Sequence, residues 1–383
     1  MTKPGGPLRF THLHLENWRN FTRVEADLGR RVVIVGPNAC GKSNLLDAFR
    51  FLHDLVSPGG FQQAVRNRGG VARLRCLAAR QHPNVTIAVH LGVDDNGPDW
   101  EYELQFAQEN LRKPAIVRER VTCAGEDILS RPDENDVEDP QRLTQTALEH
   151  VHSNRPFREL AGFFESIRYV NAVPQLIREP ARSAGRHDDP FGGALLEQIA
   201  CAPENIQCAR LRRIRDALQN VVPHLEALEL RRDARGLPHL RARYGHWRPL
   251  GAWQAEDQFS DGTLRLVALL WAALDGAGLL LAEEPEQSLH PEAVRELPKI
   301  LRGIQRRTER QVFLTTHSKE LLADERFELS ETLLLVPGEE GTTAQRAASP
   351  EDAGALLDGC FGSEASESAF DENQLALFDE GSY

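Results

Sequence analysis

The chain has 383 residues, of which 45 are basic, 57 are acidic and 41% are hydrophobic, and its formal net charge is −12. This composition is typical of a globular protein, and no apolar run reaches the roughly 18 residues that a transmembrane helix needs. The N-terminus has no apolar signal core and the six cysteines form no C-x-x-C pair, which argues against an exported disulfide scaffold or a zinc ribbon. We therefore expect a cytoplasmic protein that makes no use of a membrane.

Hydrophobic periodicity predicts two α/β ends separated by a β-rich and then a helical segment. Residues 8–35 predict two strands, and after a glycine-rich turn Leu45, Leu46, Phe49 and Leu52 fall on one face of a helix. The middle of the chain predicts an antiparallel meander over 84–129, a solvated loop over 130–141 and mostly helix over 141–235, with an apolar stripe of Leu211, Ile214, Leu218 and Val222. The second α/β end predicts helix 262–274, strand 279–282, helix 291–306, strand 312–316 and strand 332–336.

The charge is unevenly distributed along the chain. Residues 347–383 contain nine acidic side chains and no Lys or Arg, and their Ser, Glu, Asp and Gly content is typical of a disordered tail. Between Ala209 and Arg248 ten arginines stand against four carboxylates, a local excess that favours either a DNA-facing surface or simply a solvated face. These arginines are Arg210, Arg212, Arg213, Arg215, Arg231, Arg232, Arg235, Arg241, Arg243 and Arg248.

The strongest motif is a G-x-x-x-x-G-K-S phosphate loop between the apolar segment RVVIV and the first helix. In such a loop backbone N–H groups and a helix N-terminus surround phosphate oxygens. Lys42 is expected to hold the β- and γ-phosphates of ATP, and Ser43 to coordinate Mg²⁺. The loop consists of Gly36, Pro37, Asn38, Ala39, Cys40, Gly41, Lys42 and Ser43.

A second motif is LLLAEEPE, an apolar strand that ends in paired acids. Beside a phosphate loop, this pattern predicts that Glu283 holds Mg²⁺ and that Glu284 orients the attacking water. Two further segments lie in order along the chain: FSDG opens a helix, with Ser260, Asp261 and Gly262, and TTHS follows the next strand, with His317.

The ordered set GPNACGKS, FSDG, LLLAEEPE, SLHP and TTHS resembles the ABC-type ATPase heads of the RecF, SMC and OLD families, and most of all the compact RecF-like ATPases of prokaryotes. The resemblance rests on about 145 residues at the two ends of the chain. It implies an α/β fold, an ABC-type P-loop ATPase head with an antiparallel β meander and a short helical lobe inserted. It also implies a homodimer that closes on two ATP molecules.

The resemblance assigns further roles to single residues. Ser260 would contact the γ-phosphate bound by the other subunit, His317 would sense the γ-phosphate, and Ser288 to His290 would lie at the dimer seam. The motif LENWRNF resembles the family's N-terminal strand, in which polar residues approach the nucleotide, here Asn17, Arg19 and Asn20; a simple surface turn is the alternative. The family's metal-contacting glutamine is not identified, and Gln62, Gln63 and Gln175 are the candidates.

On this basis the chain divides into five segments. We expect the first part of the ATPase head at 1–55, its β-rich part at 56–140, a helical, Arg-rich insertion lobe at 141–255, the second part of the head at 256–346 and an acidic tail at 347–383. The insertion is too short and too often broken by proline for an SMC coiled coil. Too few residues follow His317 for a nuclease domain, so any cleavage would need a separate nuclease as partner.

The tail contains the apolar segment QLALF, which resembles the peptide that binds the bacterial β sliding clamp. Leu375, Leu377 and Phe378 would enter an apolar pocket, with Gln374 at its rim; docking of the tail on its own protein is the alternative. The sequence thus predicts a nucleoid-associated ATPase in DNA replication, repair or recombination, tethered to the clamp. The alternative is the ATPase subunit of an anti-phage system that controls a separate nuclease or toxin.

Overall fold

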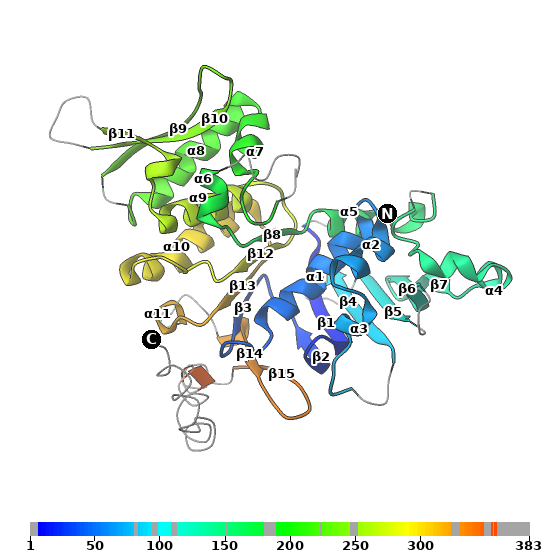
Figure 1. The fold of residues 1–383 in the computed structure, drawn as a ribbon. Helices are drawn as coiled ribbons and strands as arrows, with labels where there is room; N and C mark the ends of the chain where they lie inside the picture. The colour runs from blue at the N-terminus through cyan, green and yellow to red at the C-terminus, as the bar shows by residue number, and fades with distance from the viewer. Residues whose placement is uncertain are drawn as a thin grey trace, which may run out of the picture.

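The computed structural model describes residues 7–79, 83–93, 99–108, 113–150, 152–179, 189–222, 224–245, 252–322, 329–347, 354 and 356–357. It is an α/β fold with two large sheets and, beside them, a lobe that is built from helices and a third, smaller sheet (Figure 1). None of the helices in the described part of the chain is long and apolar enough to cross a bilayer.

The first large sheet is antiparallel, with the strand order β2-β1-β4-β5-β6-β7. Its inner face alternates apolar residues such as Phe10, Leu13 and Leu15, which pack against α1 and α5 in one core. The outer face carries the polar residues, as the period of two along a strand requires. The strands are β1 (Arg9–Trp18), β2 (Phe21–Asp27), β4 (Val85–Gly92), β5 (Trp100–Ala107), β6 (Ala115–Cys123) and β7 (Glu126–Arg131).

The second large sheet has the order β15-β14-β3-β13-β12-β8, and all its neighbours are parallel except β14 and β15. Strand β3 lies inside it and is buried on both sides, with Val32 and Ile34 in the first core and Val33 and Val35 in the second. Such a continuous apolar run is what a parallel sheet covered on both faces needs. The strands are β3 (Arg31–Val35), β8 (Arg168–Val170), β12 (Leu280–Glu283), β13 (Val312–Thr316), β14 (Thr332–Val336) and β15 (Thr343–Arg346).

Helices cover both faces of this second sheet (Figure 1). On the side of the antiparallel sheet lie α1 (Lys42–Val56), α2 (Gly60–Asn67), α3 (Val71–Leu74) and α5 (Arg158–Glu165). On the other side lie α9 (Asp261–Leu274), α10 (Pro291–Thr308) and the short α11 (Lys319–Leu322). The loops that follow β3, β12 and β13 begin at the same edge of the sheet. The phosphate loop, the paired acids and the TTHS segment therefore meet there.

The lobe packs its helices against a separate three-stranded antiparallel sheet of order β11-β10-β9. Leu211, Ile214 and Leu218 of α8 form the apolar stripe toward this sheet, and Leu240 and Ala242 of β10 face them. The elements are α6 (Pro174–Arg178), α7 (Leu195–Cys201), α8 (Glu204–Leu218), β9 (Leu225–Arg232), β10 (Pro238–Tyr244) and β11 (Ala252–Ala255).

The structure corrects three expectations about local structure. Residues 8–35 form three strands, because the chain reverses between Trp18 and Phe21 and then enters the other sheet at β3. Residues 141–235 contain strands as well as helices: β8 joins the central sheet, and β9 belongs to the sheet of the lobe. The stripe on α8 ends with the helix at Leu218, so Val222 lies beyond it.

The expected loop at 130–141 is also ordered. It contains α4 (Glu134–Glu138), whose first turn is closed by a capping box between Asp133 and Asp136. Arg131 is buried and pairs at 2.9 Å with both Asp136 and Glu119, two carboxylates that are 0% exposed. A buried guanidinium needs such partners, and this ion cluster fixes the segment that looked solvated from its composition.

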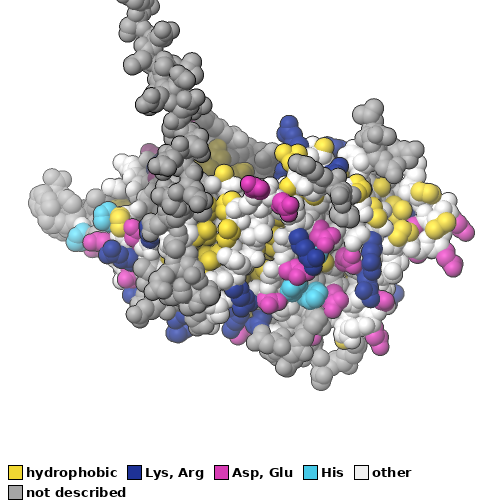
Figure 2. Space-filling view, turned by 90° about the horizontal axis from the view of Figure 1, so that it is seen from below, with side chains coloured by type: hydrophobic (Ala, Val, Ile, Leu, Met, Phe, Trp, Pro, Cys, Tyr) yellow, Lys and Arg dark blue, Asp and Glu magenta, His cyan; other side chains and the backbone are white. Residues whose placement is uncertain are grey.

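The surface seen from below interleaves basic and acidic side chains, with hydrophobic groups between them (Figure 2). Among the visible described atoms there is no single-sign field on this face.

Candidate active site: a phosphate loop beside paired carboxylates

The phosphate loop lies between β3 and α1, as its sequence predicts. Gly41 has φ of 102°, and a Cβ built at this position would lie 2.3 Å from Nδ2 of Asn20. Only glycine meets both conditions without strain. Asn38 and Ala39 at the tip of the loop are exposed, so the backbone N–H groups there are open to a phosphate.

Lys42 turns back over the loop. Its Nζ donates to the carbonyl oxygens of Gly36, at 2.9 Å, and Pro37, at 3.2 Å, and lies 3.8 Å from Oε1 of Glu284. The side chain is 7% exposed. A buried ammonium that is held mainly by neutral carbonyls is well placed to attract phosphate oxygens, which would bring the missing negative charge.

Glu283 at the end of β12 is held by three groups. The hydroxyls of Ser43 and Tyr169 donate to its two carboxylate oxygens, and Nδ2 of Asn171 lies 3.3 Å from Oε2. Burial, followed by the charge of Glu283, raises the pKa of Tyr169, so this phenol stays protonated and donates. The Arg50 guanidinium lies over its ring at 4.1 Å from the centroid. Tyr169 and Asn171 were not identified from the sequence.

Glu284 follows Glu283 but points to a different set of partners. Its Oε1 lies 3.1 Å from Nδ1 of His317, and Nε2 of Gln287 donates to its Oε2. The backbone has φ of 41°, a conformation that is uncommon for a residue with a side chain, and its N–H is held by Thr315 of β13. The carboxylate is 18% exposed, so it keeps access to a water molecule while its direction is fixed.

Glu286 forms hydrogen bonds with the end of β13 and the residue that follows it. Its Oε1 accepts from Thr316 Oγ1 and from the N–H of His317 at 3.3 Å. Burial raises the pKa of Glu286, and these two donors oppose the shift. The backbone of His317 is therefore anchored, and its ring, with 47% of the side chain exposed, has Nδ1 3.1 Å from Oε1 of Glu284.

The FSDG segment begins α9. Ser260 caps the helix by accepting from Thr263 N at 3.2 Å, and it is exposed. A Cβ at Gly262 would lie 2.7 Å from the carbonyl oxygen of Ser288, so only glycine lets the helix start pack on the segment after Glu286. Asp261 pairs at 2.6 Å with Arg178 of α6.

Arg265, one turn further along α9, faces the paired carboxylates. It shares a small cavity with Glu283 and Glu284. Burial lowers the pKa of Arg265, and the charges of Asp261 and Glu284 oppose the shift. Its buried Nε has no hydrogen-bond partner among the described residues.

Of the three polar residues in LENWRNF, Asn20 alone contacts the phosphate loop. Its Nδ2 donates to Cys40 O and to Thr342 Oγ1, both at 2.8 Å, and its Oδ1 accepts from Asn44 at 2.8 Å. Asn17 is buried and binds backbone atoms of Asn84 and Cys76.

Arg19 pairs with Asp47 of α1 at 3.1 Å. Both side chains thus contact neighbouring segments of the fold, and the assignment of Asn17 and Arg19 to the nucleotide stays a prediction.

None of the candidate glutamines contacts Glu283 or the loop. Gln62 donates to the carbonyls of Pro114 and Thr144, and Gln63 donates to Asn67 within α2. Gln175 is exposed on α6. His290 is the N-cap of α10 and accepts from Glu292 N at 3.4 Å. The residues of the tail motif, Gln374, Leu375, Leu377 and Phe378, lie outside the described part of the chain, as does Arg248.

The donor set fits Mg²⁺ bound together with a nucleotide. Mg²⁺ is usually held by one or two carboxylates and the phosphates of the substrate. Ser43 and Glu283 supply a hydroxyl and a carboxylate oxygen that already touch each other. Within the described ranges no three His, Cys, Asp or Glu side chains form a metal centre by themselves, which agrees with a site completed by phosphate oxygens.

A P-loop between β3 and α1, with a carboxylate pair at the end of β12, a parallel strand two positions away in the same sheet, defines an ATPase head. A family model described as "AAA domain, putative AbiEii toxin, Type IV TA system" matches residues 31–323, more than half of the chain. The chain belongs to this family. No curated protein matches this chain.

Solved structures with the same fold are SMC head domains. The SMC head bound to the C-terminal winged-helix domain of ScpA is 14% identical, with a TM-score of 0.55 over 90% of this chain and 99% of that one. The SMC head with coiled coil and joint from Pyrococcus yayanosii is 12% identical, with a TM-score of 0.53 over 93% and 100%. The head from Pyrococcus furiosus bound to the C-terminal domain of ScpA is 13% identical, with a TM-score of 0.51 over 93% and 100%. The chain is thus a P-loop ATPase with the ABC/SMC head fold.

Proposed function

We propose that the protein is a Mg²⁺-dependent ATPase that dimerises when ATP is bound and uses hydrolysis to separate again. The observation that carries this proposal is the convergence of Lys42, Glu283 and Glu284 at one end of the central sheet. Bound Mg²⁺, held through Ser43 and Glu283, would supply charge neutralisation on the β- and γ-phosphates.

The remaining steps belong to the chain's own residues. Lys42 would exchange the carbonyls of Gly36 and Pro37 for phosphate oxygens. Glu284 would accept a proton from the attacking water, and its fixed backbone and the Gln287 contact would keep its carboxylate in line. His317 lies within hydrogen-bond reach of Glu284 and would orient it or donate to the γ-phosphate.

The dimer is proposed from the exposed N-terminus of α9. Ser260, the N-cap of this helix, is exposed, and the γ-phosphate of a second subunit would be bound there. The arginine-rich lobe and the tail motif extend the proposal to DNA replication, repair or recombination, with tethering to the β sliding clamp through Gln374, Leu375, Leu377 and Phe378.

A second candidate function is favoured by the family match. The family's printed description refers to a toxin and a toxin–antitoxin system, and an ATPase of this kind would regulate a separate toxin or nuclease through the same dimerisation cycle.

The decisive experiment is sedimentation of Glu284→Gln with and without Mg-ATP. We expect a monomer without nucleotide and a dimer with it, because binding persists while hydrolysis stops. Adding Ser260→Arg to the same protein should restore the monomer, since a bulky cation would occupy the outer end of α9. A Glu284→Gln protein that stays monomeric while it binds ATP would contradict the proposed cycle.

A further inference from the structure

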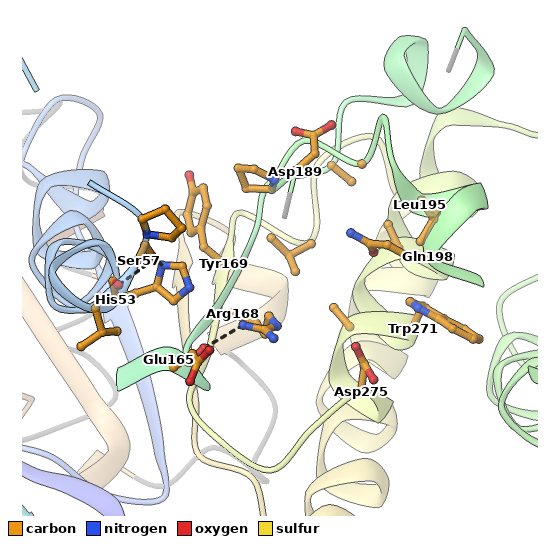
Figure 3. A pocket seen from close by; sticks show the side chains of 18 residues that line it. His53, Ser57, Glu165, Arg168, Tyr169, Asp189, Leu195, Gln198, Trp271 and Asp275 are labelled. Carbon is orange, nitrogen blue, oxygen red and sulfur yellow. Dashed lines mark hydrogen bonds between the residues drawn. The ribbon is translucent and has the colours of Figure 1, made fainter. Parts of the chain in front are cut away.

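A cavity of about 400 Å³ lies next to the ATP site but does not include it. It is bounded on one side by the end of α1 and by β8, and on the other by α7 and α9 (Figure 3). This volume falls within the range of about 300–1,000 Å³ that is usual for small-molecule sites. Such a site needs a polar anchor and an apolar wall, and both are present.

The anchor is Arg168 of β8, whose guanidinium extends into the space between the two walls (Figure 3). Its Nη1 donates to the carbonyls of Glu165, at 3.0 Å, and Ile167, at 3.2 Å. In the part of the chain that the structure describes, Arg168 forms no ion pair with a carboxylate. Burial and then the charge of Arg168 lower the pKa of the nearby Arg310 to about 10, and the charge of Asp275 opposes this shift.

The described lining of the cavity also contains three carboxylates, those of Glu165, Asp189 and Asp275. Asp275 pairs with Arg210 at 2.8 Å. The Asp189 carboxylate accepts the N–H groups of Phe191, at 3.1 Å, and Gly193, at 2.7 Å.

Glu165 is exposed at the rim. In the described part of the lining Arg168 is the one guanidinium, and neither it nor the carboxylates of Glu165 and Asp189 form an ion pair.

The apolar wall is supplied from both sides of the cavity. Trp271 and Leu195 belong to α9 and α7, Val56 is the last residue of α1, and Pro58 follows the C-cap of that helix. We propose that the cavity binds a small organic anion, a phosphate, carboxylate or sulfonate with a planar or apolar part. Arg168 would bind the anionic group through two of its N–H donors, and the apolar part would lie between these walls.

The site is coupled to the carboxylate that is assigned to Mg²⁺. Tyr169 follows Arg168 in β8; it lines the cavity and donates its hydroxyl to Glu283. An anion held by Arg168 therefore fixes the strand that positions Glu283, and it changes ATP turnover. This coupling rests on the proposed ATPase function, whereas the binding itself does not.

The test uses 8-anilinonaphthalene-1-sulfonate, an aromatic sulfonate whose fluorescence rises on binding. The full-length protein is first saturated with a non-hydrolysable ATP analogue and Mg²⁺, so that the phosphate loop is occupied. We expect a saturable site in the wild type, at least tenfold weaker binding in Arg168→Gln, and loss of binding in Ala272→Phe, which fills the cavity from α9. Arg235→Gln, which removes an exposed guanidinium in the β9–β10 turn, should bind as the wild type does.

Two results would overturn the proposal. One is binding by Arg168→Gln within twofold of the wild type while both proteins have the same melting temperature. The other is equal loss of binding in Arg235→Gln, which would mean non-specific attraction to positive charge. ATP turnover is measured in parallel, and a change with the probe in the wild type but not in Arg168→Gln supports the coupling. Probe binding without any change in ATP turnover would support the anion site and reject the coupling. A protein that binds the probe but does not hydrolyse ATP would reject the proposed ATPase function and leave the anion site supported.

Discussion

Replacement of Glu284 by Gln tests the assignment of the catalytic base. The amide has the shape of the carboxylate, so the contact with Gln287 and the backbone hydrogen bonds to Thr315 can persist. What is lost is the ability to accept a proton at an oxygen that now lies 3.1 Å from His317 Nδ1. A positioned general base contributes about 10²- to 10⁴-fold to rate. At about 1.36 kcal/mol per tenfold, the barrier should rise by about 3–5 kcal/mol.

The assay is steady-state phosphate release, with ATP binding measured separately by a fluorescent nucleotide. Turnover should fall at least 100-fold, while the dissociation constant for ATP changes less than threefold. Lys42→Ala should instead abolish binding, because Lys42 is placed to hold the phosphates. Glu296→Gln, on the exposed face of α10, is the matched control and should behave as the wild type does. Turnover of Glu284→Gln within threefold of the wild type would refute the assignment and shift attention to His317.

Three further results are expected. Tyr169→Phe removes one donor from Glu283 and should raise the Mg²⁺ concentration for half-maximal turnover about five- to tenfold, as loss of an outer-shell contact does; an unchanged Mg²⁺ titration would mean that the phenol has no role at the metal site. Arg131→Met leaves two buried carboxylates unpaired and should lower the free energy of unfolding by about 3–5 kcal/mol in urea, with the ATP affinity of the folded protein unchanged. The hydrogen bond with Glu256 raises the pKa of His239 above 6.5. Protonated His239 therefore stabilises the fold fully below pH 6.5, and this stabilisation is lost as the pH rises through the raised pKa. The melting temperature should fall between pH 6 and pH 8, and His239→Gln should show less of this fall.

Local chemistry made the nucleotide site predictable. The phosphate loop is a continuous segment, and its glycines, Lys42 and Ser43 act through their own backbone and immediate neighbours. The paired acids Glu283 and Glu284 follow an apolar strand, so their place at the edge of the sheet is also set locally. For the same reason the meander and the two later helices were predicted close to their actual bounds.

The parts that were missed depend on contacts between distant segments. Tyr169 and Asn171 reach Glu283 because β8 pairs with β12, more than 100 residues away, and no local pattern marks three residues as the edge strand of a central sheet. Asn17 and Arg19 lie in a motif that suggested nucleotide contact; both contact neighbouring segments of the fold, and their part in nucleotide binding stays a prediction.

The solvated loop was misjudged because its acids looked like surface charges. Their buried partner, Arg131, is visible only once β6 and β7 are paired.

The position of β3 in the centre of its sheet has a consequence for biosynthesis. The strand that carries the phosphate loop pairs with β13 and β14, in registers such as Val33 with Leu314 and Ile34 with Leu333. A ribosome adds about 5–20 residues per second, so roughly 15–55 seconds separate the synthesis of these partners. During that interval both edges of an apolar strand lack their native neighbours, which is the condition under which chaperones bind. The ability to hold ATP should therefore arise late and all at once, and nascent chains that stop before β14 should be substrates for quality control rather than partly active enzymes.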